Sequence, residues 1–198
     1  AEKGICFDFD SLPNPGRLRI NAQAALLVNF DNGKVLYARN VDVPRPIASI
    51  TKLMTAMVAL DLNIDLSTKV TITDEDARNS SRSRLRSGYQ LTVLDLFYAA
   101  LLNSDNRAAR ALARTAGTTT EAFVREMNAK ARKLGLKNTV FFEPTGLDSR
   151  NVSTAQEVAK ILHYAYDYSL IREITSQKTR VCRVLNRKNK LIRMANTN

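Results

Sequence analysis

Two stretches with the hydrophobic pattern of paired strands stand near the two ends of the chain. Residues 22–30 and 34–39 are strand-like, and Asp31-Asn32-Gly33 between them is a strong tight-turn signal. The pattern therefore predicts a β-hairpin. Residues 179–185 and 191–194 are also strand-like and are joined by a short polar segment, which predicts a second hairpin.

Between the hairpins the pattern is mainly that of helices. Residues 47–60 are apolar on nearly every side, which is typical of a helix buried in the middle of a protein. Residues 63–90 are polar, and we expect loops there. Apolar periodicity predicts three further helices, over 92–102, 107–115 and 121–134, the last stopping at Gly135.

Capping signals place two of the helix starts. Thr92 with Asp95 resembles a capping box, and so does Ser153 with Gln156, which predicts a helix from there to about Tyr166. Before all of these elements, residues 1–17 contain the turn-forming run Pro13-Asn14-Pro15-Gly16 and are expected to form an irregular arm.

This order of elements predicts a fold of the α/β class. A strand pair, several helices and then strands again favour an α/β sandwich in which a helical lobe is inserted into an antiparallel sheet lobe. We expect one domain over residues 1–198, with a sheet lobe of about 18–48 and 175–198 and a helical lobe of about 49–174.

Charge narrows the possible partners only a little. Lysine and arginine number 30 against 19 acidic residues, a formal charge of +11, which favours anionic partners. The chain has no zinc-finger spacing, RNA-binding aromatic signature or recognition-helix pattern, so we predict a solvated basic surface and no nucleic-acid partner. No apolar run approaches the roughly 20 residues that span a bilayer, so no transmembrane segment is predicted.

The two cysteines leave two alternatives open. Cys6 and Cys182 match no metal spacing. They are consistent with one disulfide in an exported protein and equally with two buried thiols.

The tetrapeptide Ser49-Ile50-Thr51-Lys52 is the first candidate for chemistry. Residues three apart share one face of a helix, so the serine hydroxyl and the lysine amine can meet. Serine is a weak nucleophile until a base takes its proton, and a lysine desolvated by apolar neighbours has its pKa lowered toward the working range. The alternative is an N-cap serine beside a lysine that extends to the surface, and these residues alone do not decide between the two.

Ser104-Asp105-Asn106, between two predicted helices, is the second candidate. All three residue types are good N-caps for the helix expected near Arg107, which is the structural interpretation. In the functional interpretation Ser104 relays a proton to the leaving amine and Asn106 holds the substrate backbone. Ser-x-x-Lys followed by Ser-Asp-Asn is the paired signature of penicillin-binding proteins and serine β-lactamases, and this pairing favours the functional interpretation.

The residues around these motifs carry a specific resemblance. Residues 46–56 are similar to the nucleophile segment of low-molecular-mass penicillin-binding proteins, the serine D-alanyl-D-alanine carboxypeptidases and endopeptidases. The endopeptidase branch is the one that the chain resembles most, over residues 20–198. Further similar stretches are 83–88, 128–136, 143–147 and 151–155.

The resemblance implies a β-lactamase/transpeptidase-like fold and an acyl-enzyme mechanism. Lys52 is expected to free Ser49 to attack a D-Ala peptide bond, Ser104 to protonate the departing amine and Asn106 to position the substrate. The implied partners are peptidoglycan stem peptides as substrate and β-lactams as inhibitors, with no metal or organic cofactor. The implied location is outside the cytoplasm, in the periplasm or cell envelope.

One family motif does not occur in these 198 residues, the Lys-Thr-Gly of a strand that lines the cleft. Asn196-Thr197-Asn198 resembles the segment before it, so we expect the last sheet strands to be missing and the isolated chain to be inactive. A catalytically incomplete penicillin- or peptidoglycan-binding fragment is therefore an alternative. A class A-like β-lactamase is a weaker one, because the sequence around Glu143 does not match that family's Glu-x-x-Leu-Asn pattern.

The single histidine offers no competing mechanism. His163 lies in a predicted helix with three tyrosines nearby, so we predict that it serves in packing or lies at the surface. A Ser-His-Asp triad is not expected.

Overall fold

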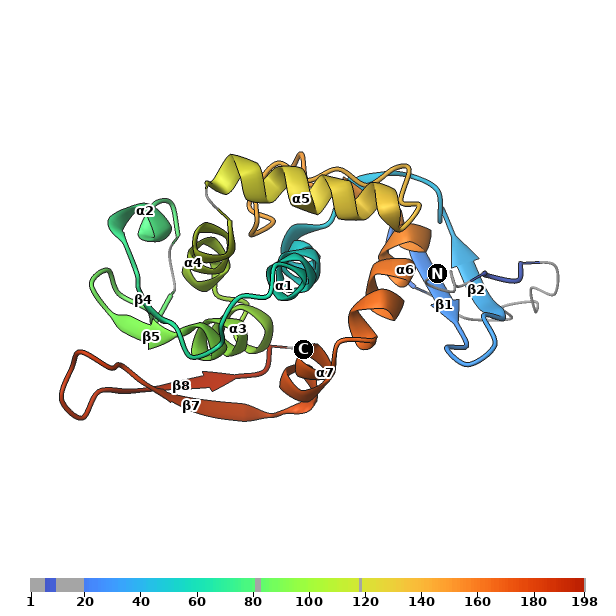
Figure 1. Cartoon of the computed structure of the whole chain (residues 1–198). Helices are drawn as coiled ribbons and strands as arrows, with labels where there is room; N and C mark the ends of the chain where they lie inside the picture. Colours follow the sequence, from blue (N-terminus) through green and yellow to red (C-terminus); the bar gives the residue numbers. More distant parts are fainter. Residues whose placement is uncertain (1–5, 10–19, 81–82, 118, 198) are drawn as a thin grey trace.

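The computed structural model describes residues 6–9, 20–80, 83–117 and 119–197 (Figure 1). Most of the predicted irregular arm at 1–17 therefore lies outside the described residues. No helix among the described residues is long and apolar enough to cross a membrane.

A buried helix, α1 (Thr51–Asp61), lies at the centre of the molecule (Figure 1). It packs against α3 (Val93–Leu102), α4 (Asn106–Ala116), α5 (Thr120–Lys133) and α6 (Ala155–Tyr166). Because helices surround it, nearly every side of α1 must be apolar, as the sequence predicted. Its buried apolar residues are Met54, Ala56, Met57, Val58 and Ala59.

The first predicted cap is confirmed and the second lies one residue later than predicted. The Thr92 hydroxyl accepts a hydrogen bond of 3.1 Å from the backbone N–H of Asp95 and begins α3. Helix α6 is capped by Thr154, whose hydroxyl accepts from the N–H of Glu157, and not by Ser153. Ser153 cannot take that role because it belongs to the short strand β6 (Val152–Ser153), which pairs with β3 (Arg45–Pro46).

The expectation of loops over residues 63–90 was wrong in part. This region contains β4 (Lys69–Thr71) and α2 (Asp74–Ala77), and β4 pairs antiparallel with β5 (Gln90–Thr92). Strands of three residues are too short to show an alternating pattern in the sequence. A further helix, α7 (Ser169–Ser176), was also not predicted.

Both predicted hairpins are present. β1 (Ala25–Val28) pairs with β2 (Val35–Arg39), and the turn before β2 uses Gly33 at a φ of +71°. β7 (Thr179–Arg183) pairs with β8 (Leu191–Ala195) in an unbroken antiparallel register.

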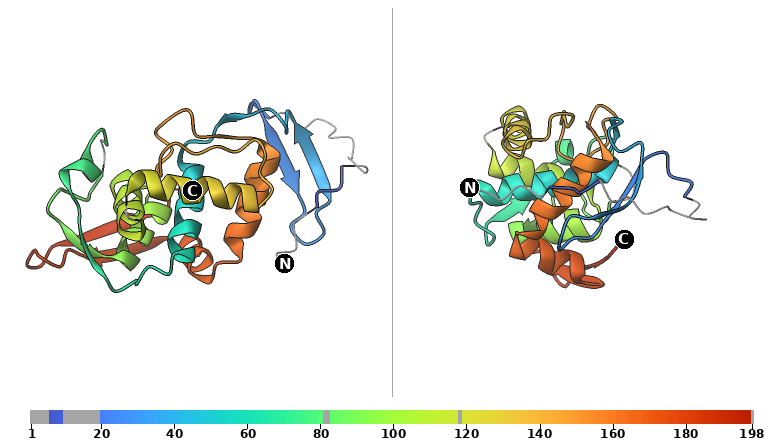
Figure 2. Two further views of the ribbon diagram at one scale, coloured as in Figure 1. Left: turned by 45° about the horizontal axis from the view of Figure 1, so that its top comes forward. Right: turned by 90° about the vertical axis from the view of Figure 1, so that its right-hand side faces the viewer.

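The two hairpins lie at opposite ends of the molecule. The β1–β2 hairpin lies beside α6, whereas the β7–β8 hairpin runs along α3 (Figures 1 and 2). They belong to separate two-stranded sheets. The grouping of both segments into one sheet lobe, with the helical lobe between them, therefore stays a prediction.

The cysteines are both free thiols in this structure. Cys6 is exposed, and Cys182 is buried, with its sulfur 3.6 Å from the sulfur of Met194. Burial raises the pKa of the Cys182 thiol to about 12, so this side chain serves as an apolar packing residue at neutral pH. His163 also packs, with its ring centroid 5.0 Å from that of Phe30, as predicted.

Candidate active site

Ser49 lies in a tight turn and not in the body of a helix. The predicted helix over 47–60 begins as one 3₁₀ turn, η1 (Ala48–Ile50), and α1 follows at Thr51. Ala48 has a φ of +45°, a conformation that L residues seldom adopt. This turn leaves the Ser49 side chain exposed at the N-terminal end of a helix, where the helix dipole favours negative charge.

Lys52 occupies the first turn of α1 and is only 2% exposed. Its ammonium nitrogen donates a hydrogen bond of 3.1 Å to the Ser49 hydroxyl and one of 2.8 Å to the backbone carbonyl of Thr145. The expected meeting of Ser49 with Lys52 is therefore present.

Burial lowers the pKa of Lys52 from its ordinary value of 10.5 to about 8. The negative charges of Glu143 and Asp105 act against this shift, and the positive charge of Arg110 adds to it. With a pKa near 8, about a tenth of the amine is neutral at pH 7. Lys52 can therefore act as a base under conditions in which an ordinary lysine cannot.

The Ser104-Asp105-Asn106 segment forms the break between α3 and α4. Asp105 is the N-cap of α4, since its carboxylate accepts from the N–H groups of Arg107 and Ala108. Its other oxygen accepts a hydrogen bond of 2.6 Å from the Ser83 hydroxyl. The cap therefore falls on the middle residue of the motif, which leaves Ser104, at a φ of +52°, and Asn106 for other roles.

Three of the four predicted site residues line one cleft. Its volume is about 640 Å³, and its walls include Ser49, Lys52 and Ser104. The rest of its lining is mainly apolar and comes from residues 47–50 at η1, from α1, α3, α6 and α7, and from Thr197. Asn106, the first residue of α4, is not among the described residues that line it.

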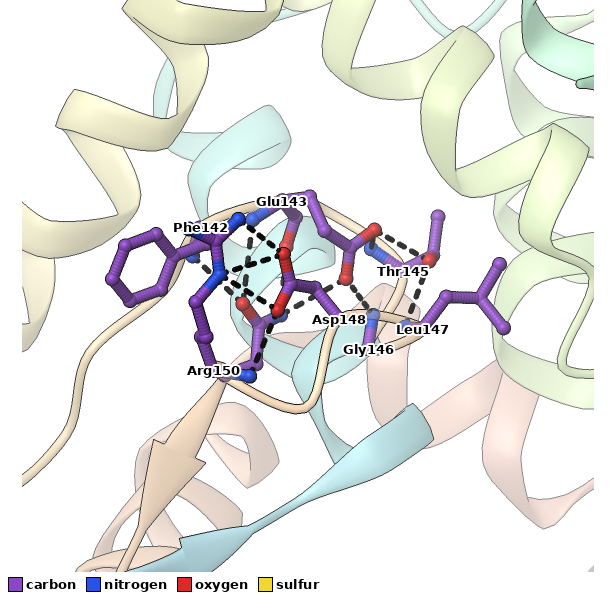
Figure 3. Close-up of polar contacts among 8 residues, drawn as sticks. Phe142, Glu143, Thr145, Gly146, Leu147, Asp148 and Arg150 are labelled. Carbon is purple, nitrogen blue, oxygen red and sulfur yellow. Dashed lines mark hydrogen bonds and ion pairs between the residues drawn. The ribbon is translucent and has the colours of Figure 1, made fainter. Parts of the chain in front are cut away.

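The loop between α5 and β6 (Figure 3) carries the Thr145 carbonyl that accepts from Lys52. Glu143 accepts hydrogen bonds from the N–H and the hydroxyl of Thr145, at 2.8 and 2.5 Å, and from the N–H of Gly146. Farther along the loop, Arg150 pairs with Asp148 and lies over the ring of Phe142. This network holds the carbonyl that accepts from Lys52.

The geometry agrees with what comparison with known proteins finds. The family model described as D-alanyl-D-alanine carboxypeptidase, of the S11 peptidases, matches residues 11–198. The chain belongs to this peptidase family.

Curated relatives and solved structures agree with this. The chain is 43% identical over 169 residues to a D-alanyl-D-alanine endopeptidase of Pseudomonas aeruginosa, covering 83% of this chain and 54% of the relative. It is 42% identical over 161 residues to the Escherichia coli endopeptidase, covering 80% and 52%. The structure matches the crystal structure of a Streptomyces DD-transpeptidase with a TM-score of 0.84 and 31% identity, over 91% of this chain and 75% of that one.

These matches confirm the predicted fold, an α/β fold of the transpeptidase type. The chain spans about half the length of the curated relatives it matches. The minor alternative of a class A-like β-lactamase gains no support, because the family model and these relatives are peptidases.

The sequence did not identify several groups that build the site of this S11 family member. The carbonyl of Thr145 is a backbone atom, and Asn151 is fully buried, where it binds the loop. A usable signal was present in the apolar helix, because Thr51 and Thr55 interrupt it. Both hydroxyls are buried and hydrogen-bonded to residues of the loop region, which explains why polar residues occur there.

Proposed function

We propose that this protein is a serine-type D-alanyl-D-alanine peptidase that cleaves peptidoglycan stem peptides through an acyl-enzyme on Ser49. The observation that carries the proposal is the 3.1 Å contact between the Lys52 amine and the hydroxyl of Ser49, which is exposed in a cleft. The family and the names of its relatives, two of them D-alanyl-D-alanine endopeptidases, support the substrate class.

The neutral Lys52 amine takes the hydroxyl proton, and the Ser49 oxygen attacks the carbonyl carbon of the D-Ala peptide bond. The negative charge that develops lies at the N-terminal end of α1. When the tetrahedral intermediate collapses, the C–N bond breaks, and Ser104 relays the proton that Lys52 took to the departing amine, so that Lys52 is neutral again. Water then hydrolyses the ester and restores Ser49.

Asn106 is assigned to holding the substrate backbone by its amide. The support for this role is its place two residues after Ser104, at the start of α4, and the family resemblance of the motif. The protein would work outside the cytoplasm, in the periplasm or cell envelope, where its substrate polymer lies, and β-lactams would acylate Ser49 as substrate mimics.

The test is acylation by a labelled penicillin, followed by mass spectrometry of the peptide that carries Ser49. An adduct on that peptide supports the proposal, and an adduct on any other residue contradicts it. Turnover is then measured on a D-Ala-D-Ala pentapeptide and on a cross-linked peptide dimer. We expect the dimer to be cleaved faster, because the two relatives described above are named endopeptidases.

A further inference from the structure

We propose that Glu143 is a positioning residue that aims the Lys52 amine at Ser49 by holding the Thr145 carbonyl in place. The inference rests on the proposed function, since it assigns Lys52 as the base. Glu143 acts through the loop and not on the substrate. Three sets of contacts carry it.

The Glu143 carboxylate is the centre of the loop that it begins. It accepts from the N–H and hydroxyl of Thr145 and from the N–H of Gly146 (Figure 3). It also accepts a hydrogen bond of 3.1 Å from the side-chain amide of Asn151. An ionised carboxylate offers about four acceptor sites and no donor, so these four donors match its charged form. A neutral amide would present a donor to at least one of them.

The loop is bound in turn to the first half of α1. The Thr55 hydroxyl donates a hydrogen bond of 2.7 Å to the Pro144 carbonyl, and Lys52 donates one of 2.8 Å to the Thr145 carbonyl. The Asn151 amide donates to the Thr51 hydroxyl at 3.2 Å. Three side chains of one helix therefore bind the segment that Glu143 holds.

The Thr145 carbonyl decides the direction in which the neutral amine presents its lone pair. A charged ammonium donates in three directions, whereas a neutral amine has two N–H groups and one lone pair. When one N–H donates to Thr145, the lone pair can face the Ser49 hydroxyl, which then donates its proton. Without a fixed carbonyl, the amine of a long flexible side chain has no preferred orientation.

Glu143 also acts on Lys52 by its charge. The charged groups that act on the ammonium are Glu143 from the loop, Asp105 at the N-cap of α4 and Arg110 within α4. Glu143 is the largest of the effects that raise the pKa against the dominant effect of burial. Removing its charge should therefore move the pKa of Lys52 below about 8.

The chain offers a matched control for the variant Glu143→Gln. Glu157 is also a glutamate that holds a loop, because its carboxylate accepts from the N–H and side-chain amide of Asn138 and from the Thr139 hydroxyl. It is 6% exposed and does not contribute to the shift of Lys52. Glu157→Gln therefore makes the same chemical change in the same kind of network.

Two measurements are made on the wild type and both variants. The first is the rate of acylation by a fluorescent penicillin across pH. The second is the pKa of Lys52, measured by ¹³C NMR titration of its ε-carbon. The Lys52→Arg variant assigns this signal, and the measurement does not require the protein to be active. For Glu143→Gln we expect the plateau rate of acylation to fall by about 10- to 100-fold. The midpoint of the pH–rate profile and the midpoint of the Lys52 NMR titration should both move to lower pH. Glu157→Gln should change only the stability.

The proposal would be overturned if Glu143→Gln had the acylation plateau and the pH midpoint of the wild type. It would also be overturned if Glu143→Gln and Glu157→Gln changed these two quantities equally. If Glu143→Gln does not fold, Glu143→Asp keeps the charge and shortens the reach, and we expect a lower plateau with a midpoint near the wild type. If neither variant folds, Glu143 is structural and the proposal is wrong. If the wild type is not acylated, the proposed function fails, and the positioning role that rests on it fails too; the NMR midpoints then still show whether the Glu143 charge acts on Lys52.

Discussion

Gly146 lies directly against the backbone of Ala48. A Cβ at position 146 would lie 1.8 Å from the Ala48 carbonyl oxygen and 3.0 Å from the backbone nitrogen of Ser49. Gly146 also has a φ of +85°, which disfavours any side chain. The loop that holds Lys52 and the turn that presents Ser49 are therefore in contact through their main chains.

We predict that Gly146→Ala lowers both stability and acylation. The methyl group must displace the backbone of Ala48, and the residue must adopt a strained φ. Left-handed strain and overpacking together cost about 2–5 kcal/mol. Urea unfolding measures the loss of stability, and penicillin labelling of the folded fraction measures the effect on Ser49.

Gly135→Ala is the control for this prediction. Gly135 has a φ of +70°, but a Cβ there would meet nothing within 4 Å. We expect it to lose only the strain energy, about 1–2 kcal/mol, with acylation unchanged. Equal losses of stability and acylation in both variants would mean that the contact with Ala48 has no role of its own.

Ser49→Ala should abolish covalent labelling by penicillin and leave the fold intact. The side chain is exposed, so its removal should change the free energy of unfolding by less than about 0.5 kcal/mol. Labelling by gel and mass spectrometry, with thermal unfolding as the check on folding, tests this. A β-lactam adduct that persists in the variant would show that another residue is the nucleophile.

The hairpins and the long helices could be predicted because their signals are local. Gly33 at a turn, Thr92 at a helix start and Gly135 at a helix end each impose a backbone conformation by themselves. The second helix start was misplaced because Ser153 and Thr154 are equally good caps, and the pairing of β6 with β3 decides between them. That pairing joins segments more than a hundred residues apart.

In the site too, the features set by local sequence could be predicted, and those set by contacts between distant segments could not. Ser49 with Lys52, and Ser104 on its interhelical break, could be predicted from spacing within short segments and from the family resemblance. The Thr145 carbonyl could not, because it reaches Lys52 from 93 residues away and no side chain marks it. Glu143 entered the sequence analysis only as part of the similar stretch 143–147 and in the comparison with the β-lactamase pattern, since its four hydrogen-bond donors become neighbours only in the folded loop.

Lys52→Arg should lower acylation by about 10²- to 10⁴-fold, the usual loss when a general base is removed. Arginine keeps the positive charge, but a guanidinium does not deprotonate in this pH range. The measurement is the rate constant of penicillin acylation, with circular dichroism to confirm the fold. A rate near that of the wild type would make Lys52 a structural residue.

The lowered pKa of Lys52 should also make stability depend on pH. The unfolded chain holds the Lys52 proton up to about pH 10.5, whereas the folded protein releases it near pH 8. Between these values the unfolded state binds more protons, so the wild type gains stability as pH rises, by about 3 kcal/mol in total. Lys52→Met has no such group, so near pH 7 it should be more stable than the wild type. This difference in the free energy of unfolding should shrink by that amount between pH 8 and 10.5.

Lys130→Met is the internal control, because it predicts the opposite sign. Lys130 is also buried, but its hydrogen bonds to Asp61 and Tyr168 outweigh the effect of burial and raise its pKa above 10.5. Its contribution is complete below pH 10.5 and is lost as pH rises through the folded-state value. The free energy of unfolding of the three proteins is measured in urea from pH 7 to 11. As pH rises, the wild type should become more stable relative to Lys52→Met. At the top of this range it should become less stable relative to Lys130→Met. The same sign for both lysines would mean that Lys52 is not held in the folded state with a lowered pKa.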